Sequence, residues 1–123
     1  MANIDNMASE IITAIRQYTE EVSESIEREL DDTSKNLLND IKANSPVKTG
    51  KYKAGWKRKK EGSSGSIKYI IYNKDKPGLA HLLEFGHAKI NGGRVAGKLH
   101  IRPAYDKHVG TMEGRIKRII VAP

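Results

Sequence analysis

The side chains best suited to chemistry lie together in the middle of the chain. His81, Glu84 and His87 are of the types that bind zinc. The zinc-protease pattern places two histidines four residues apart on one helical face, with a glutamate beside the first. Here the histidines are six residues apart and Gly86 interrupts the helix between them. The pattern fails, so a metal-dependent nuclease built on these three residues is only a remote alternative.

Other catalytic arrangements have no better support. The serines lie outside any nucleophile-elbow motif, and the sequence has no cysteine. Gly92, Gly93 and Arg94 lack the strand-to-helix setting and the final Lys-Ser/Thr of a phosphate-binding loop. We therefore expect a protein without catalytic residues, metal, cofactor or small-molecule substrate, and not an enzyme.

A run of cations is the remaining chemical signal. Lys57, Arg58, Lys59 and Lys60 follow Trp56, so alternate basic side chains would line each face of a strand. A basic strand with aromatic neighbours can follow a phosphate backbone. The other interpretation is a solvated edge strand whose lysines prevent aggregation. Because no stacking-aromatic or helix-turn-helix pattern accompanies the charge, a nucleic-acid-binding module without sequence preference is the second functional hypothesis.

Charge divides the chain into two parts. Residues 1–45 contain ten acidic and four basic side chains, net −6, whereas residues 46–123 contain five and eighteen, net +13. The basic part should therefore face an anion, either nucleic acid or the acidic part of another copy. The length fits a single domain over residues 1–123. The lack of cysteine and of a long apolar run predicts a soluble intracellular protein that does not contact membranes.

The elements that would position these residues begin with a long helix. Apolar residues recur every three or four positions and predict an amphipathic acidic helix over residues 4–44. The stripe consists of Ile4, Ala8, Ile11, Ile15, Tyr18, Val22, Ile26, Leu30, Thr33, Leu37 and Ile41. Such a helix would be roughly 60 Å long and would extend beyond its own domain. The alternative is a bend near Asp31–Ser34 that gives two shorter helices.

The rest of the chain, residues 46–123, is predicted to be a basic β-rich body. The fold class is α+β, with a small antiparallel β-sheet of about three strands between the long helix and two later helices. The expected elements are a strand over 52–60, a turn over 61–65, a strand over 66–73, a short helix over 79–85 ended by Gly86, a loop over 87–97, a strand over 98–102 and a closing helix from Pro103 to about Ile120.

Four short motifs occur in a fixed order along the chain. They are Ser45 to Tyr52, Tyr72-Asn73, Leu82 to His87, and His100 to Ala104. In this order and spacing, the chain resembles the small head-tail joining proteins of tailed bacteriophages, the gene-10-like family of Hong Kong 97-type phages. Two positions depart from the pattern, because many relatives carry an acidic residue at Lys48 and an aromatic one at Ile101.

The resemblance implies a structural virion protein of the phage neck. Such a protein acts in tail completion or as a head-tail connector, assembles as a homo-oligomeric ring and has no enzymatic activity. The implied partners are other copies of the chain, a connector or stopper protein, the tail terminator or tail tube, and in one version DNA in the channel. The implied location is the head-tail junction of the virion, and the host cytoplasm during assembly.

Residue roles follow from the resemblance together with the charge and apolar patterns. By motif position, the turns Thr49-Gly50 and Glu84-Phe85-Gly86, with Pro103 at the last helix, are expected to determine the fold. The residues expected at the subunit interface are Ile11, Ile15, Val22, Ile26 and Leu30. The residues expected to face acidic partners or DNA are Lys57, Arg58, Lys59, Lys60 and Arg94.

Overall fold

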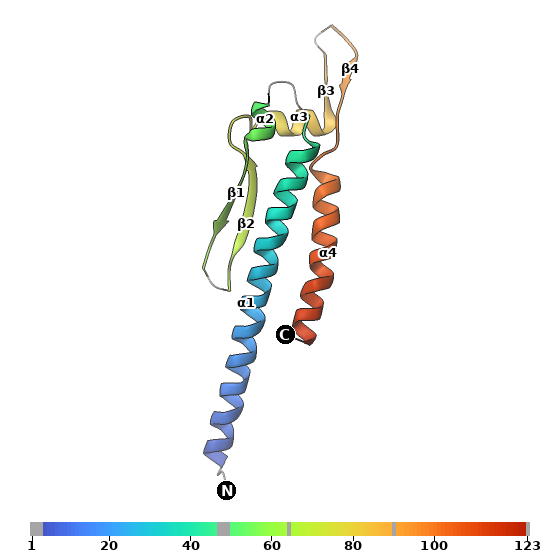
Figure 1. Ribbon diagram of the computed structural model, residues 1–123. Helices are drawn as coiled ribbons and strands as arrows, with labels where there is room; N and C mark the ends of the chain where they lie inside the picture. Colours follow the sequence, from blue (N-terminus) through green and yellow to red (C-terminus); the bar gives the residue numbers. More distant parts are fainter. Residues whose placement is uncertain (1–3, 47–49, 64, 90, 123) are drawn as a thin grey trace.

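The first element of the computed structural model is one uninterrupted helix, α1 (Ile4–Asn44) (Figure 1). The structure describes residues 4–46, 50–63, 65–89 and 91–122. The predicted long helix is confirmed, and the alternative with a bend near residues 31–34 is wrong. Ser34 does not cap a second helix, because its hydroxyl donates to the carbonyl of Asp31 within the same helix, at 2.9 Å.

The closing helix α4 (Arg102–Val121) lies antiparallel to α1 (Figure 1). Its end is fixed by the Tyr18 hydroxyl, which donates to the carbonyl of Ile120 at 2.6 Å. Nearer its start, His108 lies 2.9 Å from the carboxylate of Asp40. Helix α4 therefore lies alongside α1 from Tyr18 to Asp40. The part of α1 before Tyr18 projects beyond the body, as Figure 1 shows.

A β-hairpin packs against α1, on the other side from α4 in the view of Figure 1. It follows one helical turn, α2 (Lys51–Ala54), and consists of β1 (Trp56–Glu61) and β2 (Lys68–Asn73). The strands are antiparallel and pair Trp56 with Asn73 at one end and Glu61 with Lys68 at the other. The hairpin is confirmed, but its first strand starts later than predicted because residues 51–54 are helical.

The end of the molecule opposite the N-terminus holds α3 (Leu79–Phe85) and a second hairpin, β3 (Gly86–Ala88) and β4 (Arg94–Ala96) (Figure 1). Helix α3 has the predicted bounds. The prediction of a loop over residues 87–97 was wrong for residues 87–88 and 94–96, which pair as strands β3 and β4. The strand predicted over 98–102 does not form, because its backbone N–H groups have other partners. The N–H of Lys98 donates to the carbonyl of Leu83, and the N–H groups of residues 100–102 donate to the carboxylate of Glu84.

The α+β class is thus confirmed, and the described residues form two separate two-stranded sheets in place of one sheet of about three strands. A small core forms where α1, α2, β1 and α4 meet. Its buried members are Leu37, Ile41, Tyr52, Trp56 and Ala104. Among the described residues, no helix combines the length and the apolar character that crossing a bilayer requires.

Candidate partner-binding surfaces

Glu84 is a buried anion that holds the start of α4. Only 3% of the residue is exposed, and its carboxylate accepts backbone N–H groups from His100 (2.7 Å), Ile101 (2.9 Å) and Arg102 (2.7 Å). Burial by itself would raise the pKa of Glu84, but these three hydrogen bonds outweigh it and lower the pKa. The carboxylate thus stays ionised beside the positive end of the α4 dipole.

The three residues considered as zinc ligands, His81, Glu84 and His87, make other contacts in the structure. The ring of His81 lies against that of Phe85, with centroids 5.1 Å apart, and Glu84 is committed to the α4 start. Within the described residues, no group of three His, Cys, Asp or Glu side chains is placed to hold a metal ion. His81, Glu84 and His87 therefore do not form a ligand set there.

A second buried polar pair, which sequence reasoning missed, joins α2 to the segment before α4. The hydroxyl of Tyr52 lies 2.6 Å from Nε2 of His100, and Nδ1 of His100 lies 2.7 Å from the carbonyl oxygen of Lys98. Burial raises the pKa of Tyr52 to about 12, with a smaller contribution from the negative charge of Glu84, so the phenol keeps its proton. The only sequence signals were the motifs that contain these residues.

The motif turns place glycine where the backbone requires it. Gly50 and Gly86 both have φ of 81°, a region that other residues reach poorly. A Cβ on Gly86 would also collide with the carbonyl oxygen of Val95, whereas Gly50 has open space around it. Pro103 lies in the first turn of α4, where its missing N–H costs no helical hydrogen bond. Thr49 lies outside the described residues.

The projecting start of α1 carries apolar side chains that the described part of the chain leaves open. We call residues 7–18 the helical arm; its exposed apolar residues are Met7, Ile11, Ile12, Ile15 and Tyr18. Ile11 and Ile15, two of the five predicted interface residues, are each 58% exposed. The other three, Val22, Ile26 and Leu30, are half-buried, and the last two line a hollow beside the β1–β2 turn.

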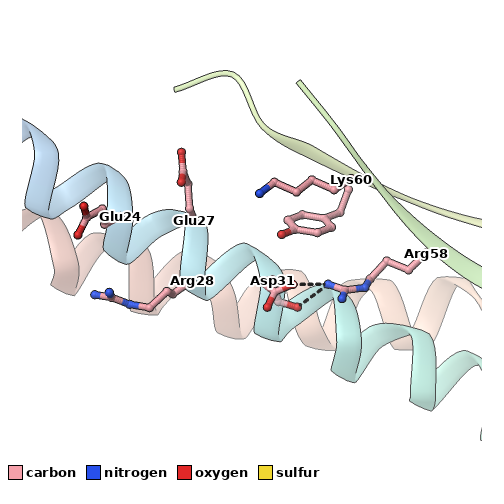
Figure 2. Close-up of a pocket in the computed structure, with 7 residues that line it drawn as sticks. Glu24, Glu27, Arg28, Asp31, Arg58 and Lys60 are labelled. Atoms are coloured by element: carbon pink, nitrogen blue, oxygen red, sulfur yellow. Dashed lines mark hydrogen bonds and ion pairs between the residues drawn. The ribbon is translucent and has the colours of Figure 1, made fainter. Parts of the chain in front are cut away.

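The predicted basic residues of β1 do not form one free row. Arg58 points toward α1 and binds the carboxylate of Asp31 at 2.6 Å, as Figure 2 shows. The hydrogen bonds from Arg58 and then Lys35 lower the pKa of Asp31 to about 2. Lys57, Lys59 and Lys60 are exposed. The basic surface of β1 therefore contains three lysines, of which Lys59 pairs with Glu61 at 3.2 Å, whereas the charge of Arg58 is balanced by Asp31 of α1.

The pocket in Figure 2 lies between α1 and β1 and has a volume of about 510 Å³. Its α1 side carries Glu24, Glu27 and Arg28, and Lys60 reaches it from β1. Both signs of charge therefore line the same space. The other predicted cation, Arg94 in β4, is exposed and donates to the carbonyl of Phe85 at 3.1 Å.

An apolar groove with a volume of about 730 Å³ lies over the C-terminal half of α1. Leu37 of α1 lines it, together with Ile71 and Tyr72 of β2 and Tyr105 of α4. Tyr105 is 51% exposed and Tyr72 is 37% exposed, so both rings are open to a partner. Lys74 supplies a positive charge, and none of the described lining residues is acidic. Sequence reasoning missed this surface because its residues come from separate elements.

Comparison with known proteins places the chain in a family. Residues 9–86, more than half of the chain, match the family described as "Bacteriophage HK97-gp10, putative tail-component". No curated protein and no solved structure gave a significant match. The matched residues include the motifs from Ser45 to Gly86, and the family is a structural component of the phage tail, not an enzyme. The chain therefore belongs to the HK97-gp10-like family of bacteriophage tail components.

Proposed function

We propose that this tail component acts in the phage neck, where it completes the tail and connects it to the head as a ring of identical subunits. Membership of the tail-component family supports a role in the virion. The helical arm is the observation that carries the proposal of self-assembly. An elongated subunit with an uncovered apolar end is suited to a structure in which neighbours share surfaces.

The arm exposes five large apolar side chains within twelve residues. Ile11 and Ile15 lie one turn apart on the same face of α1, and each is more than half exposed. Burying a side chain of this size stabilises an assembly by about 1.5–3 kcal/mol. Two such side chains per subunit, repeated around a ring, would contribute much of the association free energy.

Charge supports contacts between copies as well. The acidic first part of one chain is complementary to the basic body of another, and Lys57, Lys59 and Arg94 are exposed. The proposed partners beyond the chain itself are the connector or stopper protein on the head side and the tail terminator or tail tube on the other. In this arrangement the exposed lysines face acidic partner surfaces or the DNA in the channel.

Deleting the gene tests the proposed position. We expect filled heads together with unattached or unstable tails, because the joint between them is missing. Expression of the wild-type chain in trans should restore attachment, whereas the Ile11→Asp, Ile15→Asp double variant should not. Normal numbers of infectious particles from the deletion would refute the neck role.

The exposed lysines also favour a second candidate, binding of nucleic acid without sequence preference. Lys57 and Lys59 lie two residues apart on one face of β1, a spacing that suits contacts with successive phosphates. Retention on DNA that falls steeply with salt, and that is lost on changing both lysines to Ala, would support it. No retention at low salt would remove this candidate. Arg58→Ala, which breaks an internal ion pair, is the matched control.

A further inference from the structure

The helical arm and the apolar groove cannot meet within one chain. Both belong to the same continuous helix, α1, on which Ile15 of the arm and Leu37 of the groove are 22 residues apart. At 1.5 Å per residue, this separation is roughly 33 Å along a rigid axis. If the two apolar surfaces cover each other, they do so between different molecules.

We propose that the helical arm of one copy docks into the apolar groove of a second copy. This inference rests on the proposed self-assembly and identifies the two surfaces that perform it. Ile11 and Ile15, each 58% exposed, have the i, i+4 spacing of anchors that an amphipathic helix places into a groove, whereas the Tyr18 hydroxyl at the end of the arm stays bound to Ile120 of its own chain. The arm lies across the groove mouth, with these side chains directed toward Leu37 and Ile71.

The shape of the groove suits this occupant. Its volume of about 730 Å³ is in the range of sites that enclose several apolar groups. Two exposed tyrosines, Tyr72 from β2 and Tyr105 from α4, are among its lining residues. Aromatic side chains at such positions commonly supply the dominant contacts of an interface. Docking of the arm would cover both rings.

Charge complementarity favours the groove over a second arm as the docking site. The arm and the helical turn after it carry Glu10, Glu20 and Glu21 against a single cation, Arg16. At the groove, Lys74 is part of the lining, and none of the described lining residues is acidic. Pairing two arms in parallel would instead place Glu10, Glu20 and Glu21 opposite the same residues of the other copy.

An arm-to-groove contact joins two different surfaces, so each copy keeps a free arm or a free groove. Such heterologous contacts close into a ring when the rotation between neighbours allows it. The contact is therefore compatible with the proposed ring, and it predicts an order of assembly in which each added subunit offers a new site.

Because the chain has no cysteine, disulfide trapping can test the contact without background. A chain with Ile15→Cys is mixed with a chain with Tyr105→Cys and oxidised, and covalent dimers are separated on a denaturing gel. We expect the mixed dimer to form at least about tenfold faster than either homodimer. Thr13→Cys, on the opposite face of the arm, is the matched control and should give little mixed dimer. Equal rates for Ile15 and Thr13 variants, or a dominant Ile15→Cys homodimer, would overturn the proposal.

Complementation of two defective chains gives an independent result. The arm variant carries Ile11→Asp and Ile15→Asp, and the groove variant carries Tyr72→Asp and Tyr105→Asp. All four residues are exposed, so circular dichroism should show an unchanged fold. Each variant alone should associate roughly tenfold or more weakly than wild type. Their mixture should form dimers that grow no further, because only one intact arm and one intact groove can meet.

Self-association of the groove variant at the wild-type level would overturn the arm-to-groove contact. That outcome is distinguishable from failure of the neck role. If deletion particles lack attached tails and the groove variant restores attachment, the neck role stands and the docking proposal fails. If attachment is normal in the deletion while disulfide trapping succeeds, the contact stands and the neck role fails.

Discussion

Replacing Glu84 by Gln is the sharpest test of how the motif region is held together. Glutamine keeps the size of the side chain but removes its charge, and it replaces one acceptor oxygen with an N–H₂ donor. Oε1 of Glu84 accepts from His100 and Ile101, and Oε2 accepts from Arg102. In the variant, one of these buried N–H groups therefore faces another donor.

The magnitude follows from those contacts. Hydrogen bonds to a charged group contribute about 1.5–3 kcal/mol each, against about 0.5–1.5 kcal/mol for neutral ones. Loss of one bond and weakening of the other two should lower the free energy of unfolding by about 3 kcal/mol. For a domain of this size, that corresponds to a fall in Tm of roughly 10–15 °C. Thermal unfolding followed by circular dichroism at pH 7 measures this fall in Tm.

The matched control is Glu113→Gln in α4, because Glu113 is exposed and, among the residues that the structure describes, pairs with Lys117 alone. We expect the free energy of unfolding of this variant to lie within about 0.5 kcal/mol of the wild-type value. If Glu84→Gln also lies within 0.5 kcal/mol of wild type, the Glu84 carboxylate does not hold the start of α4 and the reasoning is refuted.

Four further predictions concern the pH dependence of Glu84 and other parts of the structure. The folded pKa of Glu84 lies below its ordinary value of 4.5, so the stability that the ionised carboxylate contributes is present above pH 4.5 and is lost as the pH falls further. The difference in free energy of unfolding between wild type and Glu84→Gln should therefore become smaller in acid. Gly86→Ala should cost about 2–4 kcal/mol and Gly50→Ala about 1–2 kcal/mol, measured by urea unfolding, because only the first adds a backbone collision. Ile11→Asp should leave Tm unchanged while weakening self-association in sedimentation experiments; a lowered Tm would contradict its free exposure. Raised salt and Glu20→Lys should both weaken self-association, and insensitivity to salt would argue against charge complementarity.

The elements that sequence predicted well are those with strong local signals. The apolar period of 3–4 residues located α1, the glycine after Phe85 located the end of α3, and Pro103 located the start of α4. These signals act within a few residues of the structure they specify. The family resemblance used the same local motifs and is confirmed by the match over residues 9–86.

The missed features depend on contacts between distant residues. The segment from His100 to Arg102 looked like a strand, but a carboxylate sixteen or more residues earlier takes its N–H groups. Strands β3 and β4 have three residues each, too few for an alternating pattern. Arg58 seemed free because its partner, Asp31, lies 27 residues away. The apolar groove could not be predicted either, because its lining residues are far apart in the sequence.

The mass of the protein in solution, measured by light scattering alone and in the presence of purified tails, tests the central claim most directly. We predict an oligomer whose mass is a whole multiple of the subunit mass and which forms at the end of the tail, even if the isolated chain associates only weakly. A monomer under both conditions would contradict assembly of the neck by ring formation.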